Sequence, residues 1–221
     1  MRRITITPEL LQELAARYAP PAREEQRFAA EDALRMAVAV GEQMCPHFAI
    51  DTYNETAYLN IARWLVGDPA MVAETTDGKE CRGSLGKGIY LQGGVGVGKT
   101  LCIDIFAIVA KYLQLGAWDT YRTDTVCGEF CRTGSVDEIT QRASVCFQDL
   151  GSEPAEVLYM GNRRNVMRSV LEQRGDMRRV TTLITSNIPI GKVGGYYGSR
   201  VQSRLVEMCN VLTIGGSDRR R

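Results

Sequence analysis

The spacing of apolar residues divides the chain into two parts. Up to about residue 85 the apolar positions recur every three to four residues, the period of an amphipathic helix, and polar breaks interrupt them. Helix-start signals and the stops that follow them predict three helices, over residues 7–18, 24–44 and 55–66. Residues 73–87 are polar and contain several glycines, which predicts a loop before the second part.

From Gly88 onward, short apolar runs alternate with helical patterns. Five strands are predicted, over residues 88–91, 118–122, 145–149, 180–185 and 210–214. Four helices are predicted between them, over residues 99–115, 135–142, 161–174 and 199–208. Such alternation is typical of a parallel sheet with helices on both faces. The predicted fold is therefore a three-layer α/β core with a five-stranded parallel sheet over residues 86–221, preceded by a small helical region over residues 1–85.

The composition narrows the class of protein. With 44% hydrophobic and 24% charged residues, the chain has the make-up of a soluble globular protein. No apolar run approaches the roughly 18 residues of a membrane-spanning helix. The first residues lack the apolar segment of a signal peptide. A cytoplasmic protein with no membrane partner is therefore expected.

The cysteines favour reduced thiols over a metal site. The chain has seven of them, an odd number, and several lie inside apolar segments. Cys127 and Cys131 are the close pair, and His47 is the single histidine. Structural zinc sites usually need two pairs of closely spaced ligands, so no metal–thiolate site is expected.

The net charge of +1 conceals an asymmetry between the two parts of the chain. Residues 1–160 contain 15 Lys and Arg against 22 Asp and Glu, a net of −7, and residues 161–221 contain 12 against 4, a net of +8. A basic C-terminal third suits contact with phosphates of a nucleotide or a nucleic acid. A solvated basic surface that pairs with the acidic part of a neighbouring copy is the alternative.

Residues 93–100 read GGVGVGKT and match the pattern GxxxxGK[ST] at every fixed position, between a predicted strand and a predicted helix. Glycines let the backbone curl so that N–H groups point at phosphate oxygens, and the helix N-terminus adds its dipole. Lys99 is expected to contact the β- and γ-phosphates, and the Thr100 hydroxyl to bind Mg²⁺. The residues predicted to bind ATP in this segment are Gly93, Gly94, Val95, Gly96, Val97, Gly98, Lys99, Thr100 and Leu101.

Three later segments carry polar residues suited to ATP chemistry. The apolar run VCF ends in Gln148 and Asp149, and a carboxylate at the end of a neighbouring strand can hold Mg²⁺ or activate water. Asn187 follows the apolar run TTLIT, where an amide can contact the γ-phosphate or cap a turn. Arg200 and Arg204 share one helix face, from which an arginine can reach the ATP of a neighbouring protomer or simply face solvent.

The chain resembles the DnaC-type replicative helicase loaders of the AAA+ class, above all phage and mobile-element members. The resemblance lies in the order and spacing of four segments, GGVGVGKT, QDLGSE, ITSN and YGSRVQSRLVEMC. The resemblance covers about residues 85–221. It implies an AAA+ P-loop ATPase of the ASCE group without the lid domain of larger members, with ATP and Mg²⁺ as cofactors. It also implies a replicative helicase and single-stranded DNA as partners, and a homo-oligomer with ATP at its subunit interfaces. Residues 1–85 match no motif and are expected to bind the partner.

The resemblance also assigns roles to individual residues. It implies Walker A for Lys99 and Thr100, Walker B for Gln148 and Asp149, sensor 1 for Asn187, box VII for Arg200 and Arg204, and sensor 2 for Arg219 or Arg220. One box VII arginine would be the arginine finger. Thr100, Gln148 and Asp149 are the implied magnesium residues. For the last arginines of the chain, a frayed basic tail is the alternative.

Gln148 departs from the family pattern, which has two acidic residues at this point. An amide accepts a hydrogen bond from a magnesium-bound water but brings no charge. Weak Mg²⁺ dependence and slow hydrolysis are therefore expected. A second register is open, in which Asp149 is the magnesium residue and Glu153 the base.

Two other classes of ATP-binding protein fit part of the pattern. An IstB-like accessory ATPase of a transposon, which acts on double-stranded DNA with a transposase, has motifs that barely differ from these. A small-molecule kinase would need a substrate pocket and a lid over the phosphates, and the sequence indicates neither.

Overall fold

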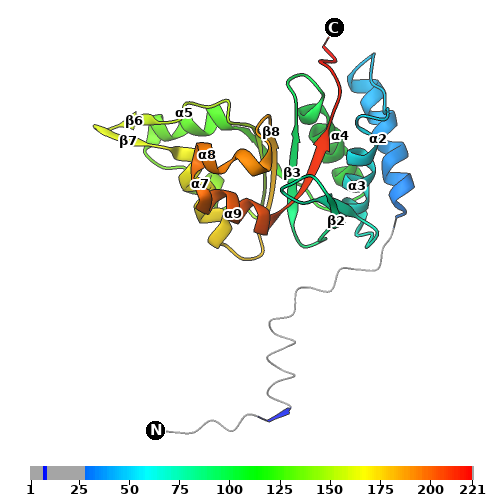
Figure 1. The fold of residues 1–221 in the computed structure, drawn as a ribbon, viewed down its shortest axis with the longest axis horizontal. Helices are drawn as coiled ribbons and strands as arrows, with labels where there is room; N and C mark the ends of the chain where they lie inside the picture. The colour runs from blue at the N-terminus through cyan, green and yellow to red at the C-terminus, as the bar shows by residue number, and fades with distance from the viewer. Residues whose placement is uncertain (1–6, 9–27, 221) are drawn as a thin grey trace.

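The computed structural model describes residues 7, 8 and 28–220 (Figure 1). The N-terminal part contains α2 (Ala30–Met44), α3 (Glu55–Val66), β1 (Val72–Glu74) and β2 (Glu80–Arg82). The later elements are β3 (Gly88–Gly93), α4 (Lys99–Tyr112), β4 (Asp119–Arg122), α5 (Thr123–Thr133), α6 (Asp137–Thr140), β5 (Ser144–Leu150), β6 (Val157–Tyr159), β7 (Asn162–Arg164), α7 (Val166–Asp176), β8 (Thr181–Ser186), η1 (Ile190–Lys192), α8 (Gly194–Tyr197), α9 (Ser199–Met208) and β9 (Cys209–Ile214). The helix predicted over 7–18 lies outside the described residues, apart from Thr7 and Pro8, and so does the start of the one predicted over 24–44.

Five parallel strands form the centre of the sheet in the order β9-β3-β8-β5-β4, which confirms the predicted parallel core. The hairpin of β1 and β2 adds to β9 in antiparallel orientation and extends the sheet to seven strands. The prediction of a loop over residues 73–87 is therefore wrong. Asp77-Gly78 is a hairpin-turn sequence, and strands of three residues are too short for an alternating pattern to be recognised.

Side chains of the central strands point alternately to two hydrophobic cores. Along β3, Ile89 and Leu91 lie in the core shared with α2, α3 and α4, whereas Tyr90 lies in the core shared with α5, α7, α8 and α9. Figure 1 shows these two groups of helices on opposite sides of the sheet. The molecule thus has the predicted three-layer α/β arrangement.

Three helical elements are absent from the sequence prediction: α5 and the short η1 and α8. α5 fills the stretch after β4, and its buried face consists of Thr123, Val126, Cys127 and Phe130. These four positions have helical spacing, but Thr123 is polar and Gly128 lies in the middle of the helix, so few strongly apolar residues and a poor helix former mark the segment. Helices are present at the positions predicted over residues 55–66, 99–115, 135–142 and 199–208. Of these, α4 ends at Tyr112, α6 covers only Asp137–Thr140, and α9 has the predicted bounds.

The helix predicted over residues 161–174 begins five residues late. A hairpin of β6 and β7 comes first, and it turns at Met160 and Gly161, which have φ values of 47° and 80°. The side chain of Asn165 then accepts a hydrogen bond of 2.9 Å from the N–H of Arg168. Because this is an N-cap interaction, the helix starts at Val166.

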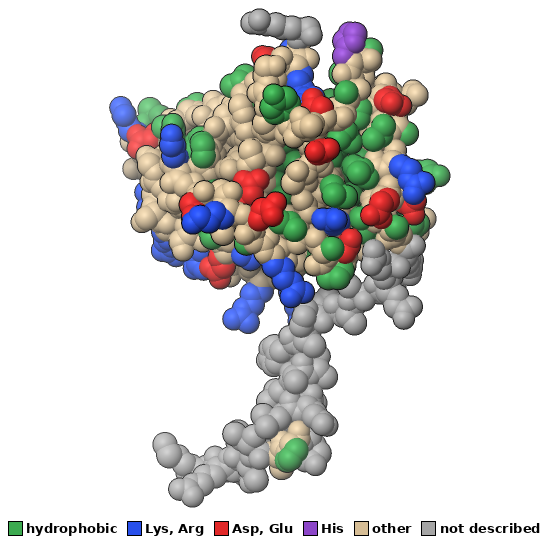
Figure 2. Space-filling model, turned by 45° about the vertical axis from the view of Figure 1, so that its right-hand side comes forward, with side chains coloured by type: hydrophobic (Ala, Val, Ile, Leu, Met, Phe, Trp, Pro, Cys, Tyr) green, Lys and Arg blue, Asp and Glu red, His purple; other side chains and the backbone are tan. Residues whose placement is uncertain are grey.

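The N-terminal helices pack directly on the α/β core. Ala33 of α2 and Ile61 of α3 are fully buried together with Phe106 of α4. On the face that these helices form, acidic and basic side chains are interspersed with apolar ones (Figure 2). Asn54 directly precedes α3, but its side chain does not cap the helix. It accepts a hydrogen bond from the Asp51 N–H and donates one to the Ala49 carbonyl. The boundary at residue 85 stays a prediction.

Candidate nucleotide-binding site

The glycine-rich loop joins β3 to α4 at the carboxyl edge of the parallel sheet. Gly98 is the N-cap of α4 with a φ of 98°, and no side chain caps the helix, so its first N–H groups can bind an anion. Gly96 has a φ of 75°, and a Cβ atom there would lie 2.1 Å from a carboxylate oxygen of Asp218. Both positions therefore require glycine.

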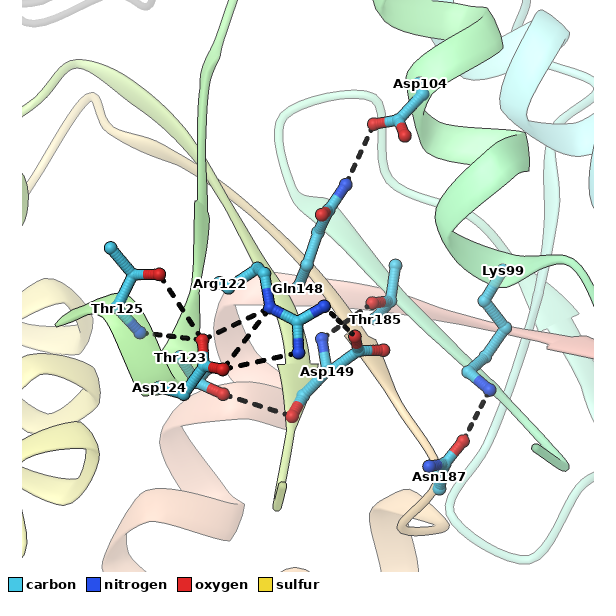
Figure 3. A network of polar contacts seen from close by, with 10 residues as sticks. All are labelled: Lys99, Asp104, Arg122, Thr123, Asp124, Thr125, Gln148, Asp149, Thr185 and Asn187. Carbon is cyan, nitrogen blue, oxygen red and sulfur yellow. Dashed lines mark hydrogen bonds and ion pairs between the residues drawn. The ribbon is translucent and has the colours of Figure 1, made fainter. Parts of the chain in front are cut away.

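Lys99 is buried under this loop. Its ammonium donates hydrogen bonds to the carbonyls of Gly93 at 3.0 Å and Gly94 at 2.6 Å, and to Oδ1 of Asn187 at 2.6 Å. Burial lowers the pKa of Lys99, an effect that the negative charge of Asp149 partly offsets. The predicted Walker A lysine and the predicted sensor 1 amide thus lie in contact, at the ends of neighbouring strands (Figure 3).

Asp149 is held by its backbone at the end of β5. Its φ is 59°, and the pairing of β5 with β8 shifts register between Phe147 and Leu150. The Asp149 N–H donates to Oγ1 of Thr185 at 3.0 Å, and its carbonyl accepts from Oγ1 of Thr123 at 3.1 Å (Figure 3). The left-handed turn lets the carboxylate leave the strand on the side of the glycine-rich loop, where it lines the cavity described next.

A cavity of about 330 Å³ lies above the loop. The cavity is lined by residues that the sequence predicted for the site, namely those from Val95 to Leu101 and also Asp149, Asn187, Arg219 and Arg220. The opposite wall comes from the segment between α2 and α3 and the start of α3, namely Cys45, His47, Phe48, Ala49, Asn54 and Tyr58. The phosphate-loop motif carries no signal for this wall, because the wall lies about 50 residues earlier in the chain. The sequence prediction therefore missed it.

The C-terminal segment crosses the glycine-rich loop. The Arg219 N–H donates to the Gly96 carbonyl at 3.0 Å, and the guanidinium contacts both carboxylate oxygens of Asp51 at 2.9 Å. These hydrogen bonds from Arg219 lower the pKa of Asp51. The segment is ordered against the site, so a frayed tail does not describe Asp218, Arg219 and Arg220.

The two predicted box VII arginines lie elsewhere. Both arginines lie on α9 and contact the carboxylate of Asp176 at the end of α7. Arg204 also contacts Glu207 at 3.3 Å. Among the described residues that line the cavity, neither arginine occurs. Within one chain the fold brings together the glycine-rich loop, Asp149 and Asn187, and it leaves Arg200 and Arg204 on another surface.

Glu153, the alternative base, is occupied by other groups. Its Oε2 accepts a hydrogen bond of 2.9 Å from the Gly151 N–H, and its Oε1 accepts one from the Tyr197 hydroxyl. Tyr197 is buried, which raises the pKa of its phenol. Both carboxylate oxygens of Glu153 are thus engaged, whereas the Asp149 carboxylate lines the cavity. This geometry favours Asp149 over Glu153 as the base, and the choice between the two registers stays a prediction.

The arrangement fits a nucleoside triphosphate with Mg²⁺. The uncapped helix N-terminus, the glycine cradle and the buried ammonium are an anion site. The Thr100 hydroxyl and the Asp149 carboxylate are oxygen donors of the kind that Mg²⁺ prefers. Gln148 is 7% exposed, and its amide nitrogen is directed at Asp104 of α4 (Figure 3).

A mostly parallel α/β sheet with a glycine-rich loop between a central strand and a helix is the architecture of the P-loop proteins. No protein-family model and no curated protein sequence matches the chain. The crystal structure of DnaI shares its fold, with a TM-score of 0.56 and 19% identity over 87% of this chain and 95% of that chain. The crystal structure of the DnaC helicase loader has a TM-score of 0.54 and 17% identity, over 77% of this chain and 95% of that chain. The chain therefore shares the fold of DnaI and of the DnaC helicase loader.

In the part of the chain that the structure describes, no helix is long and apolar enough to cross a membrane.

Proposed function

We propose that this chain is an ATP-binding AAA+ ATPase that acts as a helicase loader in DNA replication. The observation that carries the proposal is the position of Lys99. Its buried ammonium is held between the carbonyls of the glycine-rich loop and the amide of Asn187, beneath a cavity large enough for a nucleotide. The fold shared with DnaI and the DnaC helicase loader supports the choice of function.

The loop and α4 would bind the triphosphate. The N–H groups at the start of α4 point into the cavity, and Lys99 exchanges its carbonyl partners for phosphate oxygens. Mg²⁺, when bound, would neutralise charge on these oxygens and be held by Thr100, with Gln148 and Asp149 nearby. Phe48 and Tyr58 line the wall opposite the loop and supply apolar surface for the base.

Asp149 and Asn187 would act on the terminal phosphate. Asp149 lines the cavity from the end of β5 and can accept a proton from the attacking water. Asn187 already contacts Lys99, so its amide can report whether the γ-phosphate is present. Because position 148 is a glutamine, the site has one carboxylate where the family pattern has two. Slow hydrolysis is therefore expected.

An arginine from a second protomer would complete the site. Arg200 is 62% exposed in its side chain and lies away from the cavity of its own chain. An arginine finger supplied in trans explains this separation. ATP would then lie between protomers of a homo-oligomer, with Arg219 or Arg220 of the same chain near the phosphates.

The N-terminal helices are suited to convey the nucleotide state to a partner. α2 and α3 share a core with α4, and the segment between them lines the cavity. A replicative helicase that binds residues 1–85 would therefore contact elements that also contact the nucleotide. Single-stranded DNA is the second partner proposed, favoured by the excess of positive charge after residue 160.

Titration with a fluorescent ATP analogue tests the nucleotide site. Lys99→Ala should weaken binding by about tenfold or more, the size of one lost charge-assisted hydrogen bond. Lys111→Ala is the matched control, because Lys111 is an exposed lysine near the other end of the same helix. Equal affinity in the Lys99→Ala protein and the unaltered chain would rule out this site.

A pull-down with the replicative helicase of the host tests the partner. We expect ATP-dependent capture of the helicase, weakened when residues 1–27, which precede α2, are removed and retained in Lys111→Ala. Filaments on double-stranded DNA together with capture of a transposase, and no helicase binding, would favour the IstB-like alternative. A small molecule phosphorylated at the expense of ATP would indicate a kinase.

A further inference from the structure

The acidic residue absent at Gln148 has a counterpart on the facing helix. Asp104 lies one turn beyond Thr100 on α4, so the two side chains share a helix face. Oδ1 of Asp104 accepts a hydrogen bond of 2.8 Å from the amide nitrogen of Gln148 (Figure 3). A carboxylate therefore contacts the position where the sequence pattern leads one to expect an acid.

The hydrogen bond fixes the orientation of the Gln148 amide. An ionised carboxylate only accepts hydrogen bonds, so it must face the NH₂ group. The carbonyl oxygen of Gln148 is then directed away from Asp104. Because Gln148 is 7% exposed, its side chain has little room to turn over.

The charge of Asp104 is not neutralised by a cation in the described part of the chain. No Lys or Arg lies within ion-pair distance of it there. A half-buried carboxylate with one amide donor is costly, and a nearby divalent cation would offset that cost.

We infer that Asp104 is a positioning residue for Mg²⁺: it holds the Gln148 carbonyl oxygen ready to accept from a magnesium-bound water and supplies the negative charge that Gln148 lacks. The inference rests on the proposed function, since it concerns the same nucleotide site. An acid on α4 thus contacts the amide on β5, and the pair keeps one negative charge one helical turn from Thr100.

The test separates magnesium from nucleotide binding. Affinity for a fluorescent ATP analogue is measured in EDTA and in Mg²⁺, and the ratio of the two dissociation constants gives the magnesium effect. Asp104→Asn should reduce this ratio about tenfold and leave the affinity in EDTA unchanged. The exchanged double variant, Asp104→Gln with Gln148→Asp, should restore the ratio. Glu42→Gln, which removes an exposed carboxylate on α2, should change neither value.

A second measurement uses the protein without nucleotide or metal. The side-chain NH₂ resonances of Gln148 should be protected from solvent exchange in the unaltered chain and in Glu42→Gln, and lose part of that protection in Asp104→Leu, which has no acceptor for the hydrogen bond. Circular dichroism of each variant establishes that it is folded. A purely packing role for Asp104 would lower stability without changing the magnesium effect.

The outcomes distinguish this inference from the proposed function. If the unaltered chain binds no ATP, both are overturned. If it binds ATP equally well with and without Mg²⁺, or if Asp104→Asn keeps the full magnesium effect, the role of Asp104 is overturned and the nucleotide site stands. Loss of the effect in Asp104→Asn with recovery in the exchanged variant supports the inference.

Discussion

The carboxylate of Asp149 lies 3.6 Å from Nη1 of Arg122, across the ends of the neighbouring strands β5 and β4 (Figure 3). Arg122 also contacts Asp124, so one guanidinium is shared by two carboxylates. A water that donates to the Asp149 carboxylate must therefore compete with this guanidinium for it. The side chain of Asp149 is 29% exposed, so solvent screens the pair only in part.

Arg122→Gln should therefore raise the rate of ATP turnover. Removal of one partly exposed ion pair corresponds to about 0.5 kcal/mol, which is roughly a twofold change in rate. Arg142→Gln is the matched control, because Arg142 pairs with Asp119 at the same distance of 3.6 Å with similar exposure. Steady-state phosphate release measures both. A lower rate in Arg122→Gln would mean that the guanidinium assists hydrolysis.

Asp149 and Glu153 should differ in their effect on turnover. Asp149 lines the cavity, whereas both oxygens of Glu153 accept hydrogen bonds from Gly151 and Tyr197. Asp149→Asn should abolish measurable hydrolysis with ATP binding retained. Glu153→Gln should keep at least a third of the rate, and it should lower thermal stability instead, since a hydrogen-bonded carboxylate is lost. Loss of hydrolysis in Glu153→Gln alone would favour the other register.

The buried Arg174 predicts a structural effect. Its side chain is 1% exposed, and burial lowers its pKa to about 10, so it stays charged at neutral pH. The guanidinium donates hydrogen bonds of 2.7–2.8 Å to the Thr182 hydroxyl and to the carbonyls of Thr140, Arg142 and Thr181. These contacts join the end of α7 to α6 and to the start of β8.

Arg174→Met should lower the free energy of unfolding by about 3 kcal/mol, because several buried acceptors lose their donor. Arg168→Met is the control on the same helix: its partner Glu172 lies on the surface, and a change within about 0.5 kcal/mol is expected. Urea denaturation followed by circular dichroism measures both. Equal loss in the two variants would show that the buried network adds no stability.

The sequence predicts the central layer of this fold well, for a physical reason. Strands such as β3 and β8 are buried on both faces, so they are short continuous apolar runs that stand out from helices. The glycine-rich loop is equally clear, because left-handed backbone at Gly96 and Gly98 demands glycine. These features depend on local chain properties alone.

The features that the sequence does not reveal depend on contacts distant along the chain. Phe48 reaches the cavity only because α2 and α3 pack on α4. In the sequence, Asp104 is a single acidic residue in a mostly apolar helical segment, which gives no sign of a function. Its partner Gln148 lies 44 residues away. The strands β1 and β2 are too short to show alternation, and they form because β1 pairs with the free edge of β9.

The pairing of Asp176 with both Arg200 and Arg204 leads to the last prediction. The two arginines share one carboxylate on their own chain, and Arg204 is less exposed than Arg200, at 29% against 62% of the side chain. Neither arginine lines the nucleotide cavity of its own chain. If one of them serves the ATP of a neighbouring protomer, its loss leaves nucleotide binding intact and removes turnover.

Mixing variants tests this arrangement directly. Arg204→Ala and Arg200→Ala should each bind ATP with unchanged affinity, and the one that is the finger should lose most of its turnover, by about a thousandfold. Lys99→Ala has no working site but keeps both arginines. Phosphate release should therefore recover when the inactive arginine variant is mixed with Lys99→Ala, since the intact site of one protomer then faces the intact arginine of the other. Two inactive proteins that stay inactive in every mixture would mean that the arginine acts within its own chain.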